Sequence, residues 1–94
     1  MAKTATINYR VTEDHIVFET SQGKFKLPLD VKVKVLRKMR LESDDIDAFF
    51  ALLDALGDTA TANLVDDLGM LEVTRVIEAY FDEFQKFMEK SMGE

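Results

Sequence analysis

The stretch from Met70 to Met92 constrains the fold most, because its pattern predicts one long amphipathic helix. Apolar side chains recur there at alternating spacings of four and three residues, which places them along one side of a helix rather than on one face of a strand. This apolar stripe consists of Val73, Ile77, Tyr80, Phe84 and Phe87. A second row, which widens the stripe, consists of Met70, Phe81 and Met88.

The stripe holds four aromatic rings within eight residues, from Tyr80 to Phe87. A small domain does not readily bury so many rings on one helix, so part of the stripe is expected to contact a partner or a second copy of the chain. Methionine and phenylalanine repack at low cost and suit a surface that binds amphipathic helices. The residues assigned to this partner-binding surface are Val73, Ile77, Tyr80, Phe81, Phe84, Phe87 and Met88. The alternative is that the rings are core residues that pack on Phe49, Phe50 and Leu53.

The ends of this helix are marked by glycine and by charge. Gly69 permits a chain reversal before the helix, and Glu72 lies in its first turn, near the positive end of the helix dipole. Lys86 and Lys90 lie towards the negative end. The helix therefore has local signals for both its start and its stop.

The pattern of residues 1–29 predicts a small antiparallel sheet, which forms the first part of the fold. Polar and apolar residues alternate between Thr4 and Leu27, as they do in strands with one buried face. The apolar positions are Ile7, Tyr9, Val11, Ile16, Phe18, Phe25 and Leu27. Turns are predicted at Thr12–His15 and at Thr20–Gly23, where the glycine allows a positive backbone angle. Such a meander is not stable alone and needs helices to cover it.

Residues 30–94 predict four helices, of which the first is strongly basic. Pro28 ends the strand region, and Asp30 is expected to cap a helix from Val31 to Arg40. The first half of this segment also alternates like an edge strand. We choose the helix because its apolar residues fit a helical stripe and its second half consists of good helix formers.

The next two helices are short and acidic. Ser43 is expected to cap a helix that runs to Leu56, with Asp44, Asp45 and Asp47 at its positive end. Its predicted buried stripe consists of Ile46, Phe49, Phe50, Leu53 and Leu56. A third helix is predicted from Thr59 to Leu68, after Asp58, with its apolar residues at Ala62, Leu64, Val65 and Leu68. Gly57 and Gly69 are expected to form the hinges between helices.

Taken together, these elements predict a single domain over residues 1–94, with a β region at 1–29 and a helical region at 30–94. The fold class is α+β and mainly α: an N-terminal antiparallel β meander followed by a four-helix segment with a long C-terminal amphipathic helix. No apolar run approaches the roughly 20 residues of a membrane span, and no apolar segment near the start resembles a secretory signal. The chain has no cysteine, which excludes disulfides and suits a cytoplasmic protein.

The net charge of −6 is divided unevenly along the chain. Residues 1–40 contain nine Lys or Arg against four Asp or Glu, a net +5, whereas residues 41–94 contain three against fourteen, a net −11. The acidic part argues against nucleic acid as a partner, because a basic footprint would have to dominate the field. The two parts are instead expected to attract each other within one chain or between chains of a homo-oligomer.

Residues that carry catalytic or metal chemistry are scarce. The single histidine, His15, is expected on the surface of a turn, and the four glycines are isolated rather than gathered in a phosphate-binding loop. The acidic cluster before Phe49 lacks the ligand spacing of a calcium loop, so helix capping explains it better. We therefore expect a protein that is not an enzyme and that needs no cofactor or metal.

The order of these features resembles the small tail assembly chaperones of long-tailed, siphovirus-type bacteriophages, especially those of actinobacterial hosts. The resemblance covers the chain from about Phe18 onward. It rests on Leu27-Pro28, on the basic run Leu-Arg-Lys-Met-Arg at 36–40, and on Asp-x-x-Phe-x-Leu-Leu-x-x-Leu at 47–56. The aromatic-rich last helix, which stops close to Met92-Gly93-Glu94, completes the pattern.

The resemblance implies a non-enzymatic protein of the host cytoplasm that is absent from the mature virion. Members of this family bind the tape measure protein and keep that long helical polypeptide soluble while the tail tube assembles around it. They commonly exist also in a longer, frameshifted form, with which the short form can associate. Two alternatives stay open: an oligomeric structural or adaptor protein of the phage tail or connector, and a small DNA-binding regulator that uses the basic helix.

Overall fold

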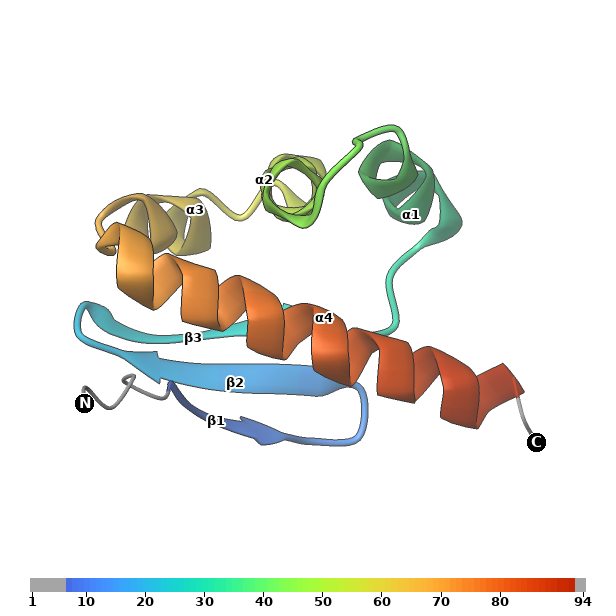
Figure 1. The fold of residues 1–94 in the computed structure, drawn as a ribbon, viewed down its shortest axis with the longest axis horizontal. Coiled ribbons are helices and arrows are strands. Elements are labelled where there is room, and N and C mark those ends of the chain that lie inside the picture. Colours follow the sequence, from blue (N-terminus) through green and yellow to red (C-terminus); the bar gives the residue numbers. More distant parts are fainter. Residues whose placement is uncertain (1–6, 93–94) are drawn as a thin grey trace.

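Three strands followed by four helices make up the computed structural model, which describes residues 7–92 (Figure 1). The strands are β1 (Asn8–Val11), β2 (His15–Thr20) and β3 (Gly23–Pro28). The helices are α1 (Val33–Arg40), α2 (Asp45–Leu56), α3 (Thr59–Asp66) and α4 (Met70–Met92). This order confirms the predicted α+β, mainly α fold. The parts of the sequence predictions that concern residues 1–6 and 93–94 lie outside the described residues.

The sheet is the predicted antiparallel meander, with the strand order β1-β2-β3. Two rows of apolar side chains cross it, Tyr9–Phe18–Phe25 and Val11–Ile16–Leu27. The ring centroids of Phe18 and Phe25 lie 5.3 Å apart in the first row. In the turn between β2 and β3, Gly23 has a φ of 130°, a conformation that other residues rarely adopt. The glycine of the predicted turn is therefore needed for the backbone itself.

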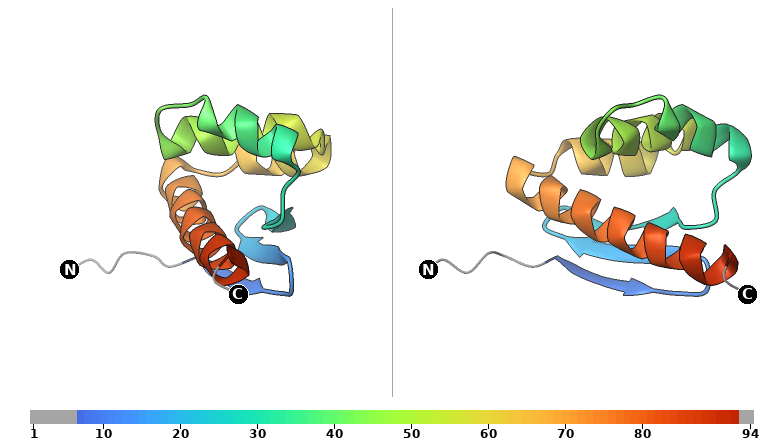
Figure 2. Two further views of the ribbon diagram at one scale, coloured as in Figure 1. Left: turned by 90° about the vertical axis from the view of Figure 1, so that its right-hand side faces the viewer. Right: turned by 45° about the vertical axis from the view of Figure 1, so that its right-hand side comes forward.

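The helix α4 crosses one face of the sheet, and the three shorter helices lie together above α4 and the β3 edge (Figures 1 and 2). The core lies where these layers meet. Its largest fully buried side chains come from the sheet, from the segment after it and from two helices: Ile16, Phe18, Leu27, Leu29, Phe49, Leu52, Val76 and Tyr80. Burial of each such apolar side chain stabilises the fold by about 1.5–3 kcal/mol.

The helix boundaries follow the caps, with corrections at three ends. α1 begins at Val33 rather than Val31, because the backbone remains extended at Lys32 and Asp30 forms no cap. The N-cap of α2 is Asp44 rather than Ser43, and its carboxylate accepts a hydrogen bond from the backbone N–H of Asp47 at 2.9 Å. α3 ends at Asp66, two residues earlier than predicted. The helix interpretation of the basic segment is confirmed over its larger, C-terminal part.

Asp58 caps α3 and Gly57 caps α2, at the positions where these helices were predicted to start and stop. The carboxylate of Asp58 accepts hydrogen bonds from the backbone N–H and the hydroxyl of Thr61, at 3.2 and 2.7 Å. Gly57 ends α2 in the left-handed conformation, with a φ of 71°. The glycine before α4 acts differently, since it has no positive φ and its carbonyl accepts the first hydrogen bond of the helix, from Val73. Gly69 therefore starts α4 without a left-handed reversal.

The buried stripe of α2 differs from the prediction. Ile46 and Phe50 were expected in the core, but they are 51% and 38% exposed. The residues that face the core are Ala48, Phe49, Leu52 and Leu53. Apolar residues occupy most positions of α2, so several stripes are possible in the sequence, and packing against α1 and α4 selects one of them.

Candidate partner-binding surface

The seven residues of the predicted partner-binding surface are divided between the core and the surface of α4. Ile77 and Tyr80 are buried, so their assignment to partner contact was wrong. Both lie in the middle of the apolar stripe, where a helix that crosses a sheet is covered most completely. Val76 is also fully buried. The prediction omitted it, although its spacing of three residues from Val73 and four from Tyr80 places it on the same face of the helix.

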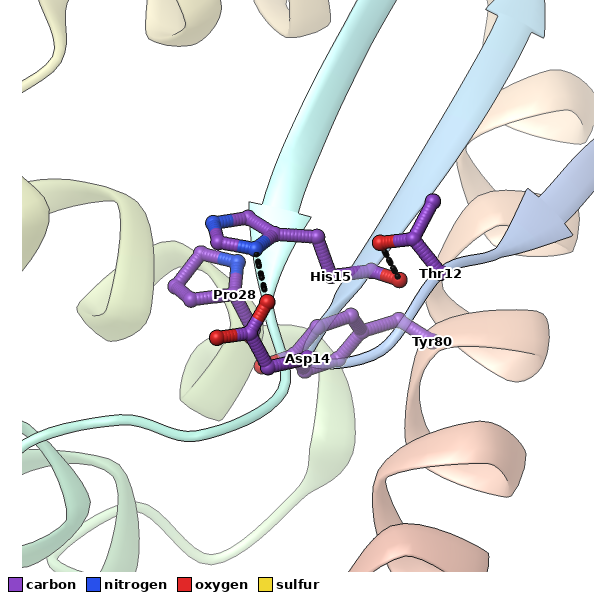
Figure 3. Close-up of polar contacts among 5 residues, drawn as sticks. All are labelled: Thr12, Asp14, His15, Pro28 and Tyr80. Carbon is purple, nitrogen blue, oxygen red and sulfur yellow. Dashed lines mark hydrogen bonds and ion pairs between the residues drawn. The ribbon is translucent and has the colours of Figure 1, made fainter.

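Tyr80 is fixed in the core by its ring and by its hydroxyl. The ring meets that of Phe49 edge-on at 5.9 Å, and the hydroxyl donates a hydrogen bond to the carbonyl of Pro28 at 2.7 Å. Figure 3 shows Tyr80 beside Pro28. Burial raises the pKa of the Tyr80 phenol far above its ordinary value. Tyr80 therefore joins α4 to the end of β3 and is not free to contact a partner.

Figure 3 also places His15 near this hydrogen bond. Its Nδ1 lies 2.7 Å from Oδ1 of Asp14, and its carbonyl accepts a hydrogen bond from the hydroxyl of Thr12 at 3.2 Å. These contacts close the turn between β1 and β2. His15 was predicted on the surface of that turn, but it is the first residue of β2 and is half-buried. Among residues 7–92, no three His, Cys, Asp or Glu side chains come together as ligands for a metal ion.

Polar contacts at two further points fix how α4 faces the sheet. Near its start, the carboxylate of Glu72 accepts hydrogen bonds from the backbone N–H and the hydroxyl of Ser21, at 2.8 and 2.6 Å. Further along, Glu83 accepts a hydrogen bond from the hydroxyl of Tyr9 at 2.9 Å. Burial, followed by this contact with Glu83, raises the pKa of Tyr9. The Glu72 and Glu83 contacts join residues more than fifty positions apart, which periodicity does not predict.

The two margins of the buried face of α4 present the surviving part of the predicted surface. Phe81 lies two residues before Glu83, so the two side chains point about 200° apart around the helix, and Met88 follows Phe81 by almost two whole turns. Phe84 lies between Phe81 and the buried Tyr80, whereas Phe87 follows Glu83 by one turn and lies on the opposite margin of the buried face. All four side chains are half-buried, and we call them the aromatic strip: Phe81, Phe84, Phe87 and Met88.

The aromatic strip rests on buried rings. Phe81 and Phe84 each contact Tyr80, at centroid distances of 5.3 and 5.7 Å, and they lie 6.3 Å from each other. The same ring system continues through Phe49 to the exposed Phe50 of α2. The three phenylalanines of the strip pack against the buried core, as Val73 does near the start of α4. The strip is thus an apolar surface with a rigid base.

Charged side chains line the other side of α4. Lys86 lies 3.2 Å from Asp82 and 3.7 Å from Glu83, one helical turn away in each case. The hydrogen bond with Asp82, supported by the nearby carboxylates, raises the pKa of Lys86. The pair with Asp82 is exposed on both sides, and such pairs stabilise a helix only slightly. Their main effect here is to keep that side of α4 polar, so that the aromatic strip is its apolar surface.

Comparisons of the chain with known protein families, with curated proteins and with solved structures gave no match. No helix in the described part of the chain combines the length and the apolar character needed to span a membrane. The arguments for function therefore come from the surface itself and from the sequence pattern.

Proposed function

We propose that this protein is a tail assembly chaperone of a long-tailed bacteriophage, which holds apolar helical segments of the tape measure protein without catalysing a reaction. The observation that supports the proposal is the aromatic strip, where three phenylalanines and a methionine stay half-exposed above a buried base. Such side chains adapt to different apolar partners, because methionine is flexible and rings pack in several orientations. The resemblance in the sequence supplies the identity of the partner.

The size of the aromatic strip suits a helix as its ligand. From Phe81 to Met88 the helix rises about 10 Å, which corresponds to about two turns of a partner helix. An amphipathic helix offers apolar anchors at positions i, i+3 or i+4, and i+7 over that length. A long tape measure helix repeats such anchors many times, so many copies of this protein could bind along it. The acidic residues 41–94, with a net charge of −11, would keep the complex soluble.

In this proposal the protein acts in the host cytoplasm and leaves before the virion is complete. A longer, frameshifted form would share the aromatic strip and bind the same partner. The structural adaptor is the competing function, because an adaptor could use the same surface but would remain in the tail. Purified virions separate the two: the chaperone is absent from them, whereas an adaptor is present in fixed stoichiometry.

Co-expression with the tape measure protein tests the proposal. We expect wild type to increase the soluble fraction of the partner and Met88→Asp to abolish that increase. A carboxylate buried in the contact would lose its hydrating water, and this desolvation disfavours binding. Met88 is the best position, since it is not among the strip residues that pack against the core. Gln85→Asp is the matched control, because it adds the same charge to an exposed position of the same helix.

Circular dichroism should show that both variants keep the helical fold. A wild type that gives no more soluble partner than the empty vector would refute the chaperone function. Equal loss of solubility with Met88→Asp and Gln85→Asp would show that added charge, rather than the aromatic strip, causes the effect. Tyr80→Asp is unsuitable for this test because Tyr80 is a core residue.

A further inference from the structure

A shallow hollow at the end of α1 combines apolar and basic side chains. Its volume is about 570 Å³, and its lining consists of Leu36, Arg37, Lys38, Arg40 and Leu41. Leu41 follows the last turn of α1 and is 82% exposed. The three cations form no ion pair with any residue in the range 7–92. We call this surface the basic hollow.

The corner between α3 and α4 has the opposite character. Met70 and Leu71 are 84% and 80% exposed, which together with Leu41 makes them the most exposed large apolar side chains of the described chain. Asp66 and Asp67 precede Met70 by four and three residues, are exposed and form no ion pair within residues 7–92. We call this surface the acidic corner.

We infer that the acidic corner of one copy docks into the basic hollow of a second copy. Each surface has large apolar side chains beside charges of one sign, and the signs are opposite, so apolar contact and charge attraction favour the same pairing. The carboxylates of Asp66 and Asp67 would meet the cations of the hollow while Met70 and Leu71 cover Leu41. This inference does not depend on the proposed function, because neither surface includes the aromatic strip.

The two surfaces cannot meet within one molecule. α1 and the α3–α4 corner lie on opposite sides along the longest dimension of the protein, which is 39 Å (Figure 1). Pairing of different surfaces is heterologous, so each added copy leaves one hollow and one corner free for the next. Copies therefore assemble in an open row or, where the rotation between successive copies closes, in a ring. Because each surface is small, a single contact should be weak and should depend on salt.

Sedimentation velocity of the full chain tests this inference with two blocking variants. Leu41→Glu blocks the hollow and leaves the corner intact, whereas Met70→Glu blocks the corner and leaves the hollow intact. Both positions are exposed, so both variants should melt like wild type. Val33→Glu is the matched control, because it replaces an exposed apolar residue outside both surfaces. If Leu41→Glu fails to fold, Arg40→Glu replaces it.

We expect wild type and Val33→Glu to form larger species as concentration rises, and this growth to decrease when the Debye length falls from about 30 Å to about 8 Å. Each blocking variant alone should stay monomeric. Their equimolar mixture should form a species of two chains and nothing larger, because only one intact hollow and one intact corner can meet. A monomeric wild type at low salt, continued growth by either blocking variant, or a mixture that stays monomeric would each overturn the inference.

Discussion

Substitution of Tyr80 tests the division of α4 between core and surface. The Tyr80 side chain is fully buried, contacts the rings of Phe49, Phe81 and Phe84, and donates its hydroxyl to the carbonyl of Pro28. Tyr80→Ala removes the ring and the hydrogen bond together, whereas Tyr80→Phe removes only the hydroxyl. The pair therefore separates the contribution of packing from that of the hydrogen bond.

The expected magnitudes differ severalfold. Truncation of a buried aromatic residue to alanine costs about 3–5 kcal/mol, a large part of the roughly 5–14 kcal/mol expected for a 94-residue domain. Loss of the hydroxyl leaves the carbonyl of Pro28 without its partner, and a cost of about 1 kcal/mol is expected because the site is only partly buried. For a domain of this size, about 1 kcal/mol lowers Tm by about 4–8 °C.

Thermal and denaturant unfolding followed by circular dichroism measure both effects. Tyr80→Phe should unfold cooperatively at a slightly lower temperature, and Tyr80→Ala should be severely destabilised or unfolded. If Tyr80→Ala melts like wild type, the ring is not part of the core and the surface assigned to α4 has to be redrawn. If Tyr80→Phe melts like wild type, the hydrogen bond to Pro28 adds no stability.

Three further predictions concern pH and the contacts of α4. The hydrogen bonds from Thr61 lower the pKa of Asp58, so the cap of α3 stabilises the fold above pH of about 4 and is lost as the pH falls; the Tm difference between wild type and Asp58→Ala should shrink in acid. Burial raises the pKa of Tyr80 above 10.0, so its contribution is complete below that pH, and stability should fall less steeply above it in Tyr80→Phe. Glu72→Gln should accelerate hydrogen exchange at the Ser21 amide.

The order and type of the elements could be predicted because each has a local signal. Alternation marks the strands, Asp58 caps α3, and Gly57 ends α2 in the left-handed conformation. The start of α1 was placed too early because Asp30 resembles a cap, whereas the chain stays extended until Lys32. Local signals therefore identify the helices and strands, but they place some of the helix ends incorrectly.

The orientation of the helices depends on contacts that the sequence does not reveal. α2 is apolar on most sides, so Phe50 seemed as suitable for the core as Leu52, and only packing against α1 and α4 distinguishes them. The sequence revealed the apolar stripe of α4, but it did not reveal which residues of the stripe are buried and which are half-buried. The position of Tyr80 at the centre of the stripe was the available signal for a core residue. The half-buried margin, at Phe81 and Met88, is where we propose that a partner binds.

The most direct test of the aromatic strip is NMR of the protein labelled at its methionine methyl groups, with a peptide from an apolar helical segment of the tape measure protein as the ligand. The methyl of Met88 lies on the strip, that of Met39 lies in the core, and that of Met70 lies at the acidic corner. Binding on the strip predicts a saturable shift of the Met88 signal, with the Met39 and Met70 signals nearly unchanged. A peptide that binds while the Met88 signal stays in place, or one that shifts Met70 instead, would contradict the account.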